Sequence, residues 1–164
     1  MQTQPVQSTG CCPPFDPEPW KDREIVWRDK LFLKDRVHSV LHVPIDMGRK
    51  MVRNQRRIEA AHAQPLQPLT LTDENSRWGA DIYLEVTAPV PGVEMARMSG
   101  TFLTRVYEGP YRNAPTWAED MRQLVQARGR TLEKLYFAYT TCPRCARAYG
   151  RNYVVLFAKV GPPN

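Results

Sequence analysis

The chain has 164 residues, of which 42% are hydrophobic and 24% are charged, and its formal net charge is +6 at pH 7. This size and composition are typical of one globular domain with a core of its own. No apolar run is long enough to span a bilayer and no secretory segment follows Met1, so we expect a cytoplasmic protein without a membrane partner. The basic residues are spread along the chain apart from one cluster, which disfavours direct binding to nucleic acid.

The first 19 residues include five prolines and predict an extended arm. A single domain is expected from residue 20 to residue 164. Its first part, Trp20 to Leu33, is too apolar to remain in water, so we expect it to pack across the domain surface or to cover a cleft.

The first core strand is predicted at Val37 to Ile45, where apolar and polar residues alternate. Asp46 can cap the helix that follows, which we expect from Met47 to about His62 because its apolar residues repeat at helical spacing. The opposite face of this helix carries the basic cluster, which consists of Arg49, Lys50, Arg53, Arg56 and Arg57. Two prolines in residues 63–72 predict a linker.

The middle of the chain predicts three strands. Residues 73–76 have the composition of a turn, and the alternation of Ile82, Leu84 and Val86 then predicts a half-buried strand. Val93 to Met98 and Thr101 to Tyr107 follow as two runs separated by Ser99-Gly100. The sequence therefore predicts a hairpin at this point.

Gly109-Pro110 ends the second of these strands, because proline has no backbone N–H for a strand ladder. A helix is predicted from about Pro115 to Arg128, followed by strands at Leu132 to Thr141 and Asn152 to Val160 on either side of a basic loop. The predicted order is strand, helix, strand, strand, and then the same again. This order indicates an α+β fold with two helices, a largely antiparallel sheet and a ligand cleft.

The segment GVEMARMSGTFLTRVYEGPYRNAPTWAEDMRQLVQARG (residues 92–129) resembles the GyrI-like small-molecule-binding family. The corner Gly109-Pro110-Tyr111 is that family's most recognisable local feature, and the likeness covers Phe32 to Val160. The resemblance implies two strand-helix-strand-strand repeats that form a cleft for flat, often cationic or aromatic, ligands.

One branch of that family looks like hydrolases of cyclopropane-bearing DNA alkylators. The chain resembles this branch in its size, in Asp73-Glu74-Asn75 followed by Trp78-Gly79-Ala80-Asp81, and in the aromatic strand Tyr136–Tyr139. The resemblance implies a cofactor-free reaction in which an aromatic cage holds a flat substrate and water opens the strained ring, so that a dienone becomes a phenol. Detoxification of such a xenobiotic would give self-resistance. The alternative is a protein that sequesters a drug without turnover, or a gyrase-inhibitor-like protein; a monomer and a homodimer both fit.

Aromatic residues fall on the elements that would line a cleft between the repeats, where rings with polar tips suit a planar aromatic small molecule. We expect the substrate-binding residues to be Trp78, Tyr83, Tyr107, Trp117 and Phe137. Glu108 or Asp81 would position the attacking water, and the hydroxyl of Tyr139 would donate to the forming phenolate oxygen. The alternative is that half or more of the rings are core and that the carboxylates cap strand ends.

Cys142 and Cys145 have the spacing of half a zinc site, and Cys11 and Cys12 could supply the other half. Side chains of adjacent cysteines diverge, however, so we expect no stoichiometric metal and no cofactor. The sequence gives no redox fold for a dithiol function, no nucleophile elbow and no phosphate-binding loop. We interpret His38, His42 and His62 as structural residues.

Overall fold

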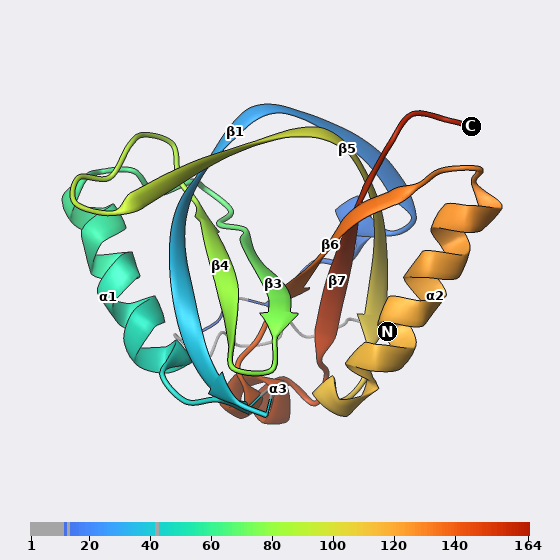
Figure 1. The fold of residues 1–164 in the computed structure, drawn as a ribbon. Coiled ribbons are helices and arrows are strands. Elements are labelled where there is room, and N and C mark those ends of the chain that lie inside the picture. The colour runs from blue at the N-terminus through green and yellow to red at the C-terminus, as the bar shows by residue number, and fades with distance from the viewer. Residues whose placement is uncertain (1–11, 13, 42) are drawn as a thin grey trace, which may run out of the picture. The chain divides into compact units, whose positions relative to one another are not determined.

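The computed structural model describes residue 12, residues 14–41 and residues 43–164 (Figure 1), and Cys11 and His42 therefore lie outside the described residues. The fold is α+β with antiparallel strand pairs, as the sequence predicts. The chain forms two compact units. The first unit contains the described residues up to Ile25, Phe102–Leu135 and Tyr139–Asn164, and the second contains Val26–Thr101 and Tyr136–Ala138.

The second unit is built on four strands in the order β2-β1-β4-β3, with one helix beside them (Figure 1). Their bounds are β1 Arg23–Val40, β2 Val43–Pro44, α1 Met47–Ala60, β3 Thr70–Ser76 and β4 Gly79–Glu85. β1 pairs with β4 so that Leu33 is opposite Leu84, and β4 pairs with β3 across a tight turn. Gly79 begins β4 at a point where a Cβ would lie 2.7 Å from the carbonyl oxygen of Val37, so only glycine fits there.

One face of this sheet packs against α1. The apolar stripe of the helix, from Met47 through Met51 to Ile58, meets alternate strand residues. The buried strand residues of this core are Leu33, Val37, Ile82 and Leu84, and the buried Val86 directly follows β4. Because side chains alternate along a strand, the intervening residues of β1 and β4 lie on the opposite face of the sheet.

The first unit contains strands in the order β6-β7-β5 and the helix α2. The bounds are η1 Glu18–Trp20, β5 Glu94–Glu108, η2 Tyr111–Asn113, α2 Ala114–Ala127, β6 Leu132–Tyr139, α3 Pro143–Tyr149 and β7 Tyr153–Val160. β7 is buried on both faces from Val154 to Ala158. α2 packs against it, and the ring of Trp20 contacts Phe157 edge-on at 5.3 Å, which explains why this strand is a continuous apolar run.

Both long helices are confirmed within two residues of their predicted ends, because their apolar periodicity is strong. Asp46 precedes α1, but its carboxylate makes no capping hydrogen bond there. It accepts hydrogen bonds at 2.8 Å from the backbone N–H and the Nδ1 of His38 instead. Burial would raise the pKa of Asp46, but these bonds hold it below its usual value. The contacts of His38 with Asp46 agree with its interpretation as a structural residue.

Several strand predictions were wrong. β1 begins at Arg23, so much of the expected surface arm is strand, and it ends at Val40 rather than Ile45. The predicted linker and turn before Ser76 contain β3, because the ladder with β4 supplies backbone hydrogen bonds from Thr70 onward. The predicted hairpin is absent, since β5 runs through Ser99-Gly100 as one strand, with Gly100 at a φ of +134°.

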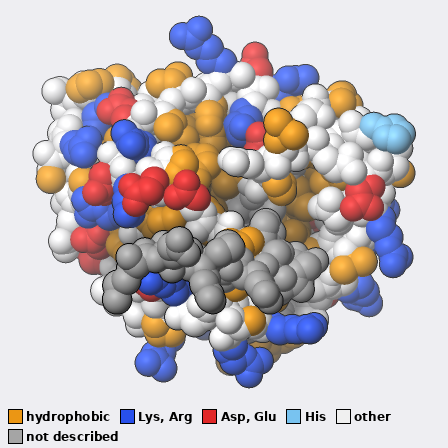
Figure 2. Space-filling model, turned by 180° about the vertical axis from the view of Figure 1, so that it is seen from behind, with side chains coloured by type: hydrophobic (Ala, Val, Ile, Leu, Met, Phe, Trp, Pro, Cys, Tyr) orange, Lys and Arg blue, Asp and Glu red, His pale blue; other side chains and the backbone are white. Residues whose placement is uncertain are grey.

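The basic cluster of α1 is partly neutralised by an acidic neighbour. Lys50 and Arg53 contact the carboxylate of Asp35 at 3.3 Å and 2.8 Å. On the face drawn in Figure 2, acidic and basic side chains lie among one another. The contacts of Lys50 and Arg53 with Asp35 agree with a solvated helix face. Within the described part of the chain, no helix is long and apolar enough to cross a membrane.

Candidate functional site

The sheet face of the second unit opposite α1 carries a row of aromatic rings. The centroid of Phe32 lies 5.9 Å from that of Trp27 and 6.4 Å from that of Tyr83, and Tyr83 lies 5.9 Å from Tyr136. The contacts of Tyr83 are edge-to-face, with interplanar angles of 86° and 89°. This geometry is favoured because the positive ring edge meets the negative ring face. We call Trp27, Phe32, Tyr83 and Tyr136 the aromatic row.

A carboxylate lies beside the aromatic row. Glu85 is two residues after Tyr83 on β4 and therefore on the same face, and its Cα is opposite that of Phe32. Its Oε1 contacts Nζ of Lys30 at 2.5 Å, and that ammonium lies 5.4 Å from the ring centroid of Trp27. Both side chains are partly exposed, at 19% and 27%. The row therefore combines rings with a solvent-accessible ion pair.

Tyr136 supplies a hydroxyl that stays protonated at neutral pH. Burial raises the pKa of Tyr136 to about 12, and the neighbouring side chains of Tyr83 and Asp73 act in the same direction. A neutral hydroxyl can donate a hydrogen bond, whereas a phenolate cannot. The position of Tyr136 beside Tyr83 thus provides a donor group at the end of the aromatic row.

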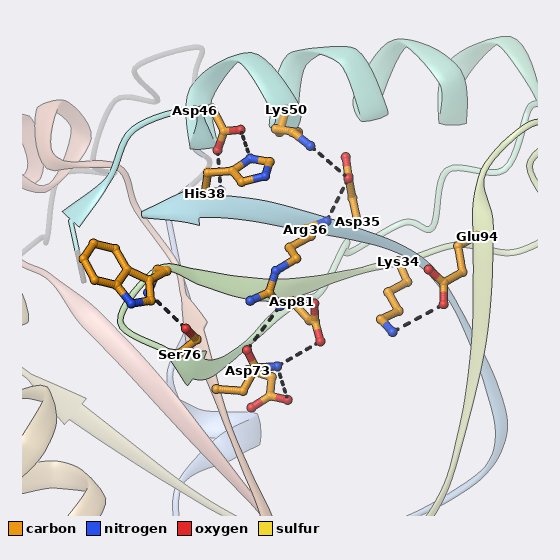
Figure 3. Close-up of polar contacts among 12 residues, drawn as sticks. Lys34, Asp35, Arg36, His38, Asp46, Lys50, Asp73, Ser76, Asp81 and Glu94 are labelled. Carbon is orange, nitrogen blue, oxygen red and sulfur yellow. Dashed lines mark hydrogen bonds and ion pairs between the residues drawn. The ribbon is translucent and has the colours of Figure 1, made fainter. Parts of the chain in front are cut away.

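The other predicted residues of this unit have different surroundings. Asp81 accepts hydrogen bonds at 2.9 Å from Nη1 of Arg36 and from Nδ2 of Asn75, in the network of Figure 3. Trp78 lies in the turn between β3 and β4 and is 60% exposed. Phe137 is buried, and as the next residue after Tyr136 in β6 it points to the other face of that strand. Among the predicted cage residues of this unit, the row thus includes Tyr83.

In the first unit, Tyr107 stacks on Trp117 at 5.6 Å with an interplanar angle of 24°. The Tyr107 hydroxyl donates to Oδ2 of Asp120 at 2.6 Å, and Nη1 of Arg105 donates to the same oxygen at 3.0 Å. Burial first, and then the hydrogen bond to Asp120, raise the pKa of Tyr107. The bonds from Tyr107 and Arg105 lower the pKa of Asp120. A tyrosine, a carboxylate and a guanidinium thus form one hydrogen-bonded set.

Glu108 and Tyr139 complete the predicted residues of the first unit. Glu108 is exposed at the end of β5, and Tyr139 contacts the ring of Tyr111 edge-on at 5.5 Å. The eight predicted residues thus divide equally: Tyr107, Glu108, Trp117 and Tyr139 belong to the first unit, and Trp78, Asp81, Tyr83 and Phe137 belong to the second. The prediction that they line one cavity stays a prediction.

A charged groove of about 430 Å³ lies within the second unit. Ion pairs join several of its lining residues: Lys34 with Glu94 at 3.3 Å and Arg36 with Asp81 at 2.9 Å (Figure 3). Asp35 lies at the groove wall on the side of α1. Burial alone would raise the pKa of Asp35, but hydrogen bonds from Asn54, from the backbone N–H of Arg36, from Arg53 and from Lys50 lower it to about 2.

This pKa predicts a pH-dependent contribution to stability. A depressed carboxylate pKa stabilises the fold above the unfolded value of 3.8, and the contribution is lost as the pH falls through about 2. We expect Asp35→Asn to lower the free energy of unfolding by about 2 kcal/mol at pH 7, at 1.36 kcal/mol per unit of pKa. Urea denaturation between pH 2 and pH 7 measures this difference, which should shrink below pH 4.

The matched control is Glu94→Gln, which changes an exposed carboxylate of the same groove and should alter stability by less than about 0.5 kcal/mol. Equal stability of Asp35→Asn and the wild type at pH 7 would contradict the prediction.

Comparison with known proteins assigns the chain to a family. A model of the family described as bacterial hydrolase matches residues 2–160. The chain belongs to the bacterial hydrolase family. No curated protein matches this family member. The finer assignment to the GyrI-like family stays a prediction.

Solved structures show that this bacterial hydrolase family member shares its fold with other proteins. A hydrolase from Listeria innocua has 14% identity and a TM-score of 0.62, over 86% of this chain and 92% of that one. The C-terminal domain of EcmrR has 11% identity and a TM-score of 0.60, over 87% and 98%. SAV2435, solved bound to tetraphenylphosphonium, has 7% identity and a TM-score of 0.50, over 86% and 94%.

Sequence reasoning about this family member missed several residues of the candidate site. Glu85 and Tyr83 alternate on one strand face, and this signal was present, but Asp81 on the same face was preferred as the water-positioning residue. Tyr136 stood in the aromatic strand beside the chosen Phe137, and a strand alone does not tell which face meets Tyr83. Asp120 follows Trp117 by three residues on α2, at a spacing that puts both side chains on one side of the helix.

Proposed function

We propose that this chain is a cofactor-free hydrolase of the GyrI-like type, which binds a flat, electrophilic small molecule through the aromatic row and opens its cyclopropane ring with water. The observation that carries the proposal is the placement of Glu85 opposite Phe32 and of Tyr136 against the ring of Tyr83. The carboxylate of Glu85 can orient a water molecule, and the hydroxyl of Tyr136 can donate a hydrogen bond. Membership in a hydrolase family supports the reaction class.

Aromatic surfaces suit a planar substrate. Each ring pair contributes roughly 0.5–1.5 kcal/mol beyond area burial, so two or three rings can hold a polycyclic molecule without an ion pair. The tetraphenylphosphonium ligand of SAV2435 carries four phenyl rings, and its binding by a protein of the same fold supports an aromatic ligand class. Trp78, Tyr107, Trp117 and Phe137 remain proposed contacts of the substrate.

The reaction adds one water and changes no net oxidation state. The water oxygen forms a bond to the cyclopropane CH₂, and the bond between that carbon and the dienone ring breaks. Its electron pair enters the ring, and the dienone oxygen becomes a phenolate that takes up a proton, while the attacking water loses one. A carboxylate that orients the water and a neutral tyrosine that donates to the oxygen are sufficient protein groups.

We assign the water-orienting role to Glu85, which contacts Lys30 at 2.5 Å and is partly exposed, and the donor role to Tyr136. Asp81 or Glu108 for the water, and Tyr139 for the donor, are the competing assignments from the sequence. Both carboxylate oxygens of Asp81 accept hydrogen bonds, Oδ1 from Arg36 and Oδ2 from Asn75, whereas the ion pair of Glu85 with Lys30 uses Oε1, which favours Glu85.

Incubation of the protein with a duocarmycin-type cyclopropane compound tests the proposal. Under single turnover, mass spectrometry should detect a product heavier by one water, formed faster than in buffer or with heat-denatured protein. Recovery of the compound intact, with saturable binding, would contradict hydrolysis and favour a protein that sequesters its ligand. Intact compound without binding would overturn the ligand class as well.

A further inference from the structure

Three cysteine thiols from distant parts of the sequence converge in the first unit. The Sγ atoms of Cys12, Cys142 and Cys145 all lie within 4.8 Å of one another. Cys12 precedes Cys142 by 130 residues, and the backbone N–H of Cys142 lies 3.5 Å from Sγ of Cys12. The hydroxyl of Tyr149 also donates to the carbonyl oxygen of Cys12. The N-terminal arm is therefore held against α3 at its cysteine.

We propose that Cys12, Cys142 and Cys145 bind one Zn²⁺ ion, with water as the fourth ligand. In a tetrahedral site with Zn–S bonds of ~2.3 Å, the sulfur atoms lie roughly 3.8 Å apart. The observed upper limit of 4.8 Å is one small side-chain rotation away from this spacing. Thiolates are soft ligands that favour zinc among the common divalent cations.

Burial fits an ion at the edge of the unit. Cys145 is buried, at 0% exposure, whereas Cys12 and Cys142 are partly exposed. The partly exposed side gives the fourth ligand access to solvent. The expectation of no metal depended on the poor fit of two adjacent cysteines to one ion. That premise does not apply here, because Cys12 reaches the pair and Cys11 is not required.

The role of the ion is to fasten the N-terminal arm to the connection between β6 and β7. A metal clip that closes a long loop stabilises the folded chain, because it binds the native arrangement and restricts the unfolded one. The ion adds a structural site in the first unit, whereas the aromatic row belongs to the second. The two proposals can therefore fail separately.

The test uses the full chain, purified with its thiols reduced, loaded with zinc and freed of excess metal. Elemental analysis should give one zinc per chain. Loading with Co²⁺ instead should produce the thiolate-to-metal absorption and the intense visible bands of a tetrahedral site. Cys12→Ser and Cys142→Ser should each weaken zinc affinity at least tenfold in a chelator competition. Cys145→Ser should do the same, but its buried position makes it the variant most prone to misfolding.

Cys11→Ser is the matched control and should keep the wild-type affinity. A second readout is thermal unfolding: added zinc should raise Tm for the wild type and for Cys11→Ser, but not for Cys12→Ser. The proposal is overturned if the reduced wild type takes up no zinc, if Cys12→Ser retains full affinity, if Cys11→Ser loses it, or if intact-mass analysis under native conditions finds a disulfide among the three residues.

Discussion

Trp117→Ala is expected to lower the free energy of unfolding by about 3–5 kcal/mol, the usual cost of truncating a buried aromatic residue. Trp117 is 7% exposed, stacks on Tyr107 and lies against Gly109, where a Cβ would be 3.6 Å from its ring. It thus joins α2 to the end of β5 within the first unit. Urea denaturation followed by circular dichroism measures the loss.

Two variants separate the ring from its surroundings. Thr116→Ala changes the exposed neighbour on the same helix and should have an effect below about 0.5 kcal/mol. Tyr107→Phe keeps the stacked ring but removes the hydrogen bond to Asp120, and should cost about 1–2 kcal/mol. A Trp117→Ala protein with wild-type stability would show that the indole is not part of the core and would strengthen its assignment to a ligand cage.

Glu85→Gln is expected to slow ring opening by about 10²-fold or more at saturating substrate. The neutral amide is a weaker hydrogen-bond acceptor than a carboxylate and cannot take up a proton from the attacking water. Binding should change little, since the substitution is isosteric and leaves the aromatic row in place. Single-turnover rates, with a separate measurement of ligand affinity, give both quantities.

Tyr136→Phe should also lose about 10²-fold in rate, because it removes the donor to the forming phenolate.

Asp81→Asn and Glu108→Gln are the matched controls for Glu85→Gln. Each removes one carboxylate that the sequence proposed for the same role, and each should retain most of the rate. Loss of rate in one of these controls, with Glu85→Gln unaffected, would transfer the water-orienting role to that residue. Stability measurements are needed alongside, although a partly exposed pair such as Lys30–Glu85 contributes little to folding.

The predictions from sequence were most accurate for local patterns. The stripes around Met47 and Trp117 gave both long helices, because an amphipathic helix carries its signal within its own residues. β3 was missed because Pro65, Pro68 and the polar residues before Ser76 read as a linker and a turn. The order of the longer strands around the two long helices came out as predicted, since the missed β3 and the wrongly divided β5 compensate for each other. The two-residue β2 and the third helix, α3, were not predicted; α3 lies in the segment between β6 and β7 that was expected to be a basic loop.

The site was harder to predict because its contacts join distant residues. The i, i+2 spacing of Tyr83 and Glu85 is visible in the sequence, but the ion pairs that commit Asp81 to Arg36 and Glu85 to Lys30 are not. These pairs depend on the register between β1 and β4, which is set by the whole sheet. The approach of Cys12 to Cys142 was invisible for the same reason.

The division of the chain into units has a consequence for protein engineering. The boundary between the two units falls within β1 after Ile25 and within β5 after Thr101. Of β6, only Tyr136–Ala138 belongs to the second unit. Each of these boundaries lies inside a strand, so neither unit can be excised at a surface loop as an expressible fragment. Shortened versions of the protein must therefore be trimmed from the ends of the chain, and split reporters or domain exchanges need sites in the loops between elements rather than at the boundaries of the units.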